Sequence, residues 1–207
     1  MSKPDTKIKI LALVIALLTV SVFLPALQYD FVNFDDNLVV YDNPNIRALD
    51  SKFFKYMLSF EHTMWTPLTR LSRAVDYAVW ELDPTGHHLT NILLHGFNTF
   101  LAVILIIRLI GARAITPSSV LGKEDTFLRD ALIAGGVTGL LFGIHPLRVE
   151  SVVWVTERKD VLSGSFMLLT LVYYLKSSTV SVQKKIRIYY VLSLIFFAMA
   201  LMSKPIA

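Results

Sequence analysis

The feature that most constrains this chain is an apolar run at residues 8–28, directly after the amino terminus. A helix over this run, at about 1.5 Å per residue, is about 30 Å long and matches the hydrocarbon thickness of a bilayer. A cleaved signal peptide is the alternative interpretation, but the run exceeds the usual apolar core of about 7 to 15 residues. It ends in LPALQ, which has no clean small-x-small cleavage site. An uncleaved first span is favoured, and both interpretations export the residues that follow.

Four more apolar segments follow the first one. With 54% hydrophobic residues and a mean hydropathy of +0.56, the chain is too apolar for an ordinary soluble domain. The third and fourth runs are short, so we expect them to tilt or to draw length from the loop between them. We predict an all-α, polytopic membrane bundle of about five transmembrane helices. The predicted spans are 8–28, 88–110, 131–147, 161–175 and 188–203, and the predicted exported loops are 29–87 and 145–160.

The charges agree with this topology. A cytoplasmic amino terminus places eleven of the twenty basic residues in short cytoplasmic segments, as the positive-inside rule expects. Loop 29–87 carries nine acids against five bases. The net charge of +4 therefore follows from topology, and we expect no nucleic-acid partner. The absence of cysteine excludes disulfides, thiolate metal sites and thiol nucleophiles, and the chain has no Walker, Gly-x-Ser-x-Gly or HExxH motif.

The long exported loop has the pattern of ordered structure. Asp50 or Ser51 could cap a short helix, and Thr66 followed by Pro67 is typical of a cap and a first helical position. Apolar residues then recur at helical spacing through residue 82, which predicts an amphipathic helix. We expect this second helix to lie in the membrane interface as a scaffold.

Segment 145–160, HPLRVESVVWVTERKD, carries three bases and three acids between two apolar runs. Burying six charges in lipid would cost on the order of 15 to 20 kcal/mol. The segment must therefore lie at a membrane surface or in a wet cavity. Paired charges there are a candidate site for an anionic, membrane-borne substrate.

Two other groups of polar residues could act in such a site. Asp35 and Asp36 could accept a proton from a hydroxyl or ligate a hard cation, although an isolated Asp-Asp pair is more often a cap or a turn. A second group shares one face of the predicted second span, where its members either make interhelical hydrogen bonds or line a substrate cavity. These residues are His88, Asn91, His95 and Asn98. The two histidines lie about 10 Å apart along the helix axis, which disfavours a shared metal ion.

The third span carries Ala131, Gly135, Gly139 and Gly143 at intervals of four residues. Such a face of small residues allows another helix to approach closely. We interpret it as a packing surface.

Several of these segments occur together in an order that resembles a known family. They are FDD at 34–36, WTPLTRLSRAVDYAVW at 65–80, HLTNILLH at 88–95, HPLRVESVVWVTERKD at 145–160 and ALMSKP at 200–205. The chain resembles the amino-terminal membrane part of the transmembrane and tetratricopeptide-repeat protein O-mannosyltransferases, which belong to the C-type glycosyltransferase superfamily. No tetratricopeptide repeat is visible in residues 1–207. We therefore expect a partial membrane domain, a fragment that is inactive alone.

The resemblance implies a transferase that uses a polyprenyl-phosphate sugar, with a mannose-like sugar and a protein Ser or Thr hydroxyl as acceptor, on the extracytoplasmic face. It implies that Asp35 or Asp36 is the catalytic carboxylate and could hold a divalent cation if one is used. It implies a donor-phosphate site and two orienting acids. The expected phosphate ligands are His145, Arg148, Arg158, Lys159 and Lys204, and the expected orienting residues are Glu150 and Asp160.

The chain also departs from the family pattern. Thr66 stands where many relatives have Arg, which leaves the role of segment 65–69 open. Trp154 and Lys159 replace small residues of eukaryotic members and indicate a bacterial branch, hence an inner-membrane protein. Two other functions stay open: a transporter or flippase for a lipid-linked sugar, and a noncatalytic membrane anchor for a repeat scaffold.

Overall fold

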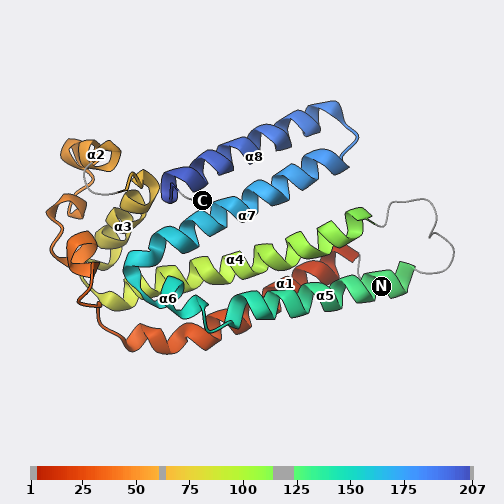
Figure 1. The fold of residues 1–207 in the computed structure, drawn as a ribbon, viewed down its shortest axis with the longest axis horizontal. Coiled ribbons are helices and arrows are strands. Elements are labelled where there is room, and N and C mark those ends of the chain that lie inside the picture. Colours follow the sequence, from red (N-terminus) through yellow and green to blue (C-terminus); the bar gives the residue numbers. More distant parts are fainter. Residues whose placement is uncertain (1–3, 61–63, 114–123, 206–207) are drawn as a thin grey trace.

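The computed structural model describes residues 4–60, 64–113 and 124–205, and these residues form helices and turns without a strand. Long helices lie side by side along one axis, and the shorter helices gather at one end (Figure 1). This arrangement confirms the predicted all-α class. The helices are α1 Pro4–Phe23, α2 Ser51–Leu58, α3 Pro67–Trp80, α4 Pro84–Arg113, α5 Glu124–Ile144, α6 Arg148–Val153, α7 Arg158–Thr179 and α8 Gln183–Ser203.

Four helices in the described part of the chain are long and apolar enough to cross a membrane. These candidate spans are Asp5–Gln28, Pro84–Gly111, Thr126–Ile144 and Gln183–Ser203. Together they support a multi-pass membrane protein. Helix α7 is not among them, and its first turn carries three consecutive charged residues, 158–160. Lys3, Lys123 and Glu61, which contributed to the charge comparison between the two sides, lie outside the described residues.

The third and fourth predicted spans are longer helices than their apolar runs indicated. Helix α5 has 21 residues and α7 has 22. Polar residues extend α5 at the end far from the 145–160 segment and α7 at both ends, so hydrophobicity alone underestimated their length. Helix α5 ends at Ile144, three residues before the predicted end of that span. Pro146 comes two residues later, and a proline disfavours helical backbone in the residue before it, which is His145.

The predicted face of small residues on α5 is a close packing surface. A Cβ atom added at Gly139 would lie 2.3 Å from Val103 of α4, and one added at Gly143 would lie 2.2 Å from Thr19 of α1. Both separations are far below van der Waals contact. Glycine at these positions lets α5 lie against α1 and α4, which confirms the packing interpretation.

Loop 29–87 contains the two predicted helices. Asp50 caps α2 by accepting a hydrogen bond of 2.9 Å from the Phe53 amide. Pro67 begins α3 as predicted, but the side chain of Thr66 makes no capping hydrogen bond, so that part of the prediction is wrong. Helix α3 turns its polar side inward, because Arg70 and Arg73 are buried while Val79 is 64% exposed. This inward polar face is the first indication that α3 contributes to a site. The location of α3 in the membrane interface stays a prediction.

Candidate functional site

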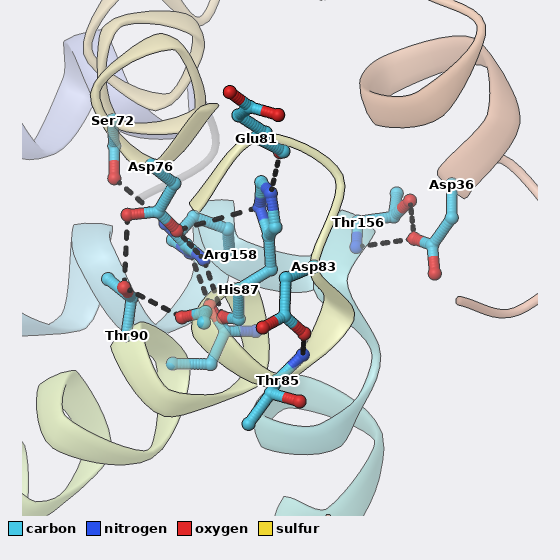
Figure 2. Close-up of polar contacts among 12 residues, drawn as sticks. Asp36, Ser72, Asp76, Glu81, Asp83, Thr85, His87, Thr90, Thr156 and Arg158 are labelled. Carbon is cyan, nitrogen blue, oxygen red and sulfur yellow. Dashed lines mark hydrogen bonds and ion pairs between the residues drawn. The ribbon is translucent and has the colours of Figure 1, made fainter. Parts of the chain in front are cut away.

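The FDD segment and the charged segment 145–160 are in direct contact, although 120 residues separate them in sequence. The buried carboxylate of Asp36 accepts hydrogen bonds from the Thr156 amide at 2.9 Å and from the Thr156 hydroxyl at 2.6 Å (Figure 2). It also accepts one from the Val32 amide at 2.9 Å. The indole N–H of Trp154 donates to the Phe34 carbonyl at 3.1 Å. These bonds fasten loop 29–87 to the segment directly before α7.

Asp35 has a different environment from its neighbour. Its φ of 63° lies in the left-handed region, which is uncommon for a residue with a side chain and costs roughly 1–2 kcal/mol. In the described part of the chain its carboxylate has no ion-pair or hydrogen-bond partner. It lines a cavity of about 440 Å³. Asp36, held by three hydrogen bonds, fixes the adjacent backbone in place, and this constraint directs Asp35 to the cavity wall.

Three basic residues line the same cavity as Asp35: Arg70, Arg73 and Lys159. Helix α3 supplies the two arginines and the first turn of α7 supplies the lysine. Lys159 forms an ion pair of 2.7 Å with Glu157. Burial, together with the charge of Arg158, lowers the pKa of Arg73 to about 10, which still leaves it cationic at neutral pH. The cavity wall therefore carries one carboxylate against three cations, an arrangement suited to an anionic ligand.

Each arginine in the cavity is held by the loop around it. Arg73 donates to the Thr156 carbonyl at 2.7 Å. Arg70 lies 4.6 Å from the centre of the Tyr56 ring and donates to the Ser59 carbonyl at 2.9 Å. Because these contacts restrict both guanidinium groups before any ligand binds, the wall is preorganised for an anion.

Arg158 lies in the core, away from the cavity wall. Its guanidinium is completely buried and pairs with Asp76 at 2.6 Å. It also donates to the Ser72 hydroxyl at 3.1 Å, to the His87 carbonyl at 2.8 Å, and to the Asn91 side chain (Figure 2). These contacts join α7 to α3 and α4. With its donors engaged in this way, Arg158 positions the neighbouring helices.

A second, smaller cavity of about 160 Å³ lies on the other side of the first turn of α7. Arg148 and Asp160 line it, together with His95 and Asn98 of α4. Asp160 forms an ion pair with Lys204, which ties the carboxyl end of α8 to the start of α7. Lys159 and Asp160 are consecutive residues of one helix, so they point into different cavities.

The remaining residues predicted from the charged segment are more exposed. His145 and Arg148 line a third cavity of about 480 Å³. The guanidinium of Arg148 lies 4.4 Å from the centre of the Phe142 ring. Glu150 is exposed. The structure therefore distributes His145, Arg148 and Lys159 over three cavities, buries Arg158 in the core and pairs Lys204 with Asp160.

The polar face of α4 is buried and makes interhelical hydrogen bonds. Asn98 donates to the Val161 carbonyl at 2.8 Å, and a ring nitrogen of His95 lies 2.8 Å from the Gly143 carbonyl. Asn91 lies 3.3 Å from the Trp154 carbonyl. His88 is 1% exposed, and its ring nitrogens have no hydrogen-bond partner in the described residues. His95 and Asn98 also line the smaller cavity, and their expected role in lining a substrate cavity stays a prediction.

Sequence reasoning did not single out Arg70, Arg73, Asp76 or Thr156. Three of these lie in WTPLTRLSRAVDYAVW, at spacings of three residues that place them on one side of a helix. The helix was interpreted from its apolar side alone. Two arginines and an aspartate on the opposite side were the available signal, because charged residues gathered on one side of a membrane-surface helix need partners.

In the parts of the chain that the structure describes, no group of three or more His, Asp or Glu side chains is arranged to hold a metal ion. Asp35 is the carboxylate of the FDD pair that faces a cavity, whereas the oxygens of Asp36 accept hydrogen bonds from protein donors. Of the predicted pair, Asp35 is therefore the residue with free acceptor capacity.

Comparisons with known proteins found relatives that are named protein O-mannosyl-transferases. The chain is 37% identical over 118 residues to protein O-mannosyl-transferase tmtc2 of Xenopus laevis, covering 57% of this chain and 12% of that protein. It is 30% identical over 175 residues to protein O-mannosyl-transferase TMTC4 of Homo sapiens, covering 80% and 23%. It is 24% identical over 204 residues to protein O-mannosyl-transferase F38B6.6 of Caenorhabditis elegans, covering 94% and 27%.

The chain thus has homologues among the protein O-mannosyl-transferases, at low identity, as the order of its motifs predicted. It spans about a quarter or less of the length of TMTC4 and tmtc2. No protein-family model matches the chain, and no solved structure matches it significantly.

Proposed function

We propose that this chain is the amino-terminal membrane part of a glycosyltransferase that moves a mannose-like sugar from a polyprenyl-phosphate donor to a protein hydroxyl. The observation that carries the proposal is the 440 Å³ cavity, which places the carboxylate of Asp35 together with Arg70, Arg73 and Lys159. A sugar phosphate needs cations for the phosphate, and an acceptor hydroxyl needs a base. The cavity supplies both, and the homologues named protein O-mannosyl-transferase support this choice of reaction.

The proposed step is a single displacement at the anomeric carbon. The acceptor oxygen attacks this carbon as its proton passes to the Asp35 carboxylate. The bond between the anomeric carbon and the phosphate oxygen breaks, and the electron pair leaves with the lipid phosphate. Lys159 and the two arginines stabilise the negative charge that develops on that phosphate. Attack opposite the leaving group inverts the configuration of the anomeric carbon.

Other predicted residues have supporting parts in this proposal. Asp36 holds the loop that presents Asp35, and Arg158 holds α3 and α4 against α7 so that Arg73 and Lys159 face the cavity. His145, Arg148 and Lys204 stay predictions for donor binding, and Glu150 and Asp160 for orienting bases. A divalent cation, if the reaction uses one, would meet Asp35 in the cavity wall.

The topology of the proposal follows the positive-inside rule. The basic residues near the ends of α1, α4, α7 and α8 would lie in the cytoplasm, and the Asp35 cavity would lie at the opposite, extracytoplasmic end. Trp154 and Lys159 support a bacterial branch of the family and hence the bacterial inner membrane.

The decisive experiment compares Asp35→Asn with Asp36→Asn in the full-length protein that contains this chain. Transfer of a labelled sugar from a polyprenyl-phosphate donor to a peptide with Ser and Thr is measured in detergent, and thermal unfolding is followed in parallel. Asp35→Asn removes the base without any fold contact, so we expect transfer to be lost with an unchanged unfolding midpoint. Asp36→Asn weakens the anchor to Thr156, so we expect the midpoint to fall.

Asp42→Asn in the same loop serves as the matched control and should retain transfer. Normal transfer by Asp35→Asn would contradict the catalytic assignment. Sugar-lipid movement across reconstituted vesicles without transfer would instead indicate a transporter. If alanine replacement of both Asp35 and Lys159 caused no phenotype, the chain would be a noncatalytic anchor.

A further inference from the structure

A cavity of about 380 Å³ lies at the end of the bundle that is opposite to Asp35. It is formed between α1, α4, α5 and α7, near the amino terminus of α1 and the turn from α7 to α8 (Figure 1). One candidate span begins at Asp5, another ends at Gly111 and a third begins at Thr126. Asp5 and Gly111 line this cavity. It therefore lies at the depth where the bundle would leave the hydrocarbon and meet lipid headgroups.

Two cations from different helices face this cavity, Arg108 of α4 and Lys176 of α7. Both side chains are half-buried. In the described residues neither forms an ion pair or a side-chain hydrogen bond. The Lys176 ammonium lies 4.7 Å from the centre of the Tyr173 ring and 5.9 Å from that of Tyr189, which holds it in place without neutralising it. Two adjacent, partly desolvated cations without a carboxylate partner favour an external anion.

Most of the other lining residues are apolar. Ile8, Phe127 and Leu128 line the cavity beside the two cations, and Phe127 is 38% exposed. A free anion would gain nothing from these side chains, whereas a lipid would place its acyl chains on them. Asp5 is the acid in the wall and leaves a net charge of +1 from the three ionisable side chains.

We propose that this cavity binds the phosphate headgroup of an anionic phospholipid, with Arg108 and Lys176 on the phosphate and the acyl chains along Phe127 and Leu128. Further basic residues at this end raise the local concentration of anionic lipid. They are Lys7, Lys9, Arg129, Lys184, Lys185 and Arg187. The site is independent of the Asp35 cavity and of the reaction proposed there.

The test measures lipid binding to the delipidated, purified protein by native mass spectrometry. The probes are phosphatidylglycerol, phosphatidylcholine with the same acyl chains, and glycerol phosphate. At the energy usual for a basic residue near an anionic lipid surface, the double variant Arg108→Gln/Lys176→Gln should bind phosphatidylglycerol about thirtyfold more weakly. The matched control, Lys184→Gln/Lys185→Gln, removes the same charge at the same end but outside the cavity, and should lose much less affinity.

Two further variants keep the proposal testable if the double variant folds poorly. A Cβ atom added at Gly111 would meet no described atom within 4 Å, and Gly111 lines the cavity, so Gly111→Leu places an apolar side chain there while leaving every charge in place. It should abolish the preference for phosphatidylglycerol. Asp5→Asn should tighten binding, because it removes the one negative charge from the wall.

Four outcomes would overturn the proposal. These are equal binding of phosphatidylglycerol and phosphatidylcholine, equal losses in the two double variants, unchanged binding by Gly111→Leu, and competition by glycerol phosphate at the same concentration as the lipid. The last result would assign the site to a free phosphate ester. Circular dichroism and the unfolding midpoint confirm that each variant is folded.

Discussion

The buried ion pair between Asp76 and Arg158 makes the sharpest prediction about what holds the site together. The two side chains are 7% and 0% exposed, and the closest atoms are 2.6 Å apart. Removing one partner leaves the other charge buried without compensation, which typically costs about 3 to 5 kcal/mol. We therefore expect Asp76→Leu and Arg158→Met each to lower the free energy of unfolding by about this amount.

The double variant Asp76→Leu/Arg158→Met tests the reasoning more strictly than either single change. It removes both charges of the pair. The Asn91 side-chain oxygen and the His87 carbonyl, which accept hydrogen bonds from Arg158, then lose their donor, which costs about 1 to 3 kcal/mol. If the single changes were independent, the double variant would lose about 6 to 10 kcal/mol. We expect instead a loss close to the 1 to 3 kcal/mol of the orphaned acceptors.

Unfolding in mixed micelles, followed by tryptophan fluorescence during a denaturant titration, measures these differences. Asp130→Asn is a suitable control because the Arg129–Asp130 pair, at 3.1 Å, has side chains that are 67% and 61% exposed. Water already solvates that pair, so this change should have no measurable effect. Additive losses in the Asp76 and Arg158 variants would refute the idea that the pair is one coupled, buried unit.

Three further perturbations test other contacts. Gly139→Val would force a Cβ to within 2.3 Å of Val103, and this overpacking should destabilise the fold by about 1 to 3 kcal/mol and lower the unfolding midpoint. The control Gly111→Ala has open space around the added Cβ and should leave the midpoint unchanged. Equal effects of the two changes would contradict the packing of α5. Asp50→Ala should cost about 1 kcal/mol and increase hydrogen exchange in α2 alone, and protected amides there would show that the cap is dispensable. Trp154→Phe removes the 3.1 Å hydrogen bond to the Phe34 carbonyl and should reduce sugar transfer without changing the unfolding midpoint. Normal transfer by this variant would show that the bond is not needed to hold Asp35 in the cavity wall.

Much of the fold could be predicted from local sequence. Apolar runs, helix caps and prolines act over a few residues, so the long helices, the Asp50 cap and the start of α3 at Pro67 could be inferred along the chain. The surface on which α5 packs closely against α1 and α4 could be inferred from small residues that recur every fourth position. The lengths of α5 and α7 were underestimated because neighbouring helices and the membrane surface accept polar residues that a hydropathy pattern counts as loop.

The candidate site could be predicted only in part. The FDD pair and the charged segment were visible as unusual clusters of charge, and their contact through Asp36 and Thr156 joins the two. Arg70 and Arg73 were missed because the apolar side of α3 dominated its pattern, although the buried side is the polar one.

The sequence by itself therefore determined which segments are helical and where charged residues cluster between apolar runs, because apolar length, helical spacing and turn chemistry are local properties. Only the tertiary structure decided how the charges are divided. Consecutive residues on the first turn of α7 point in different directions, so Arg158 enters the core, Lys159 joins Asp35 at one cavity and Asp160 faces another. The difference between Asp35 and Asp36 has the same origin, because two of the three hydrogen bonds to Asp36 come from Thr156, which lies 120 residues away and is brought close only by folding.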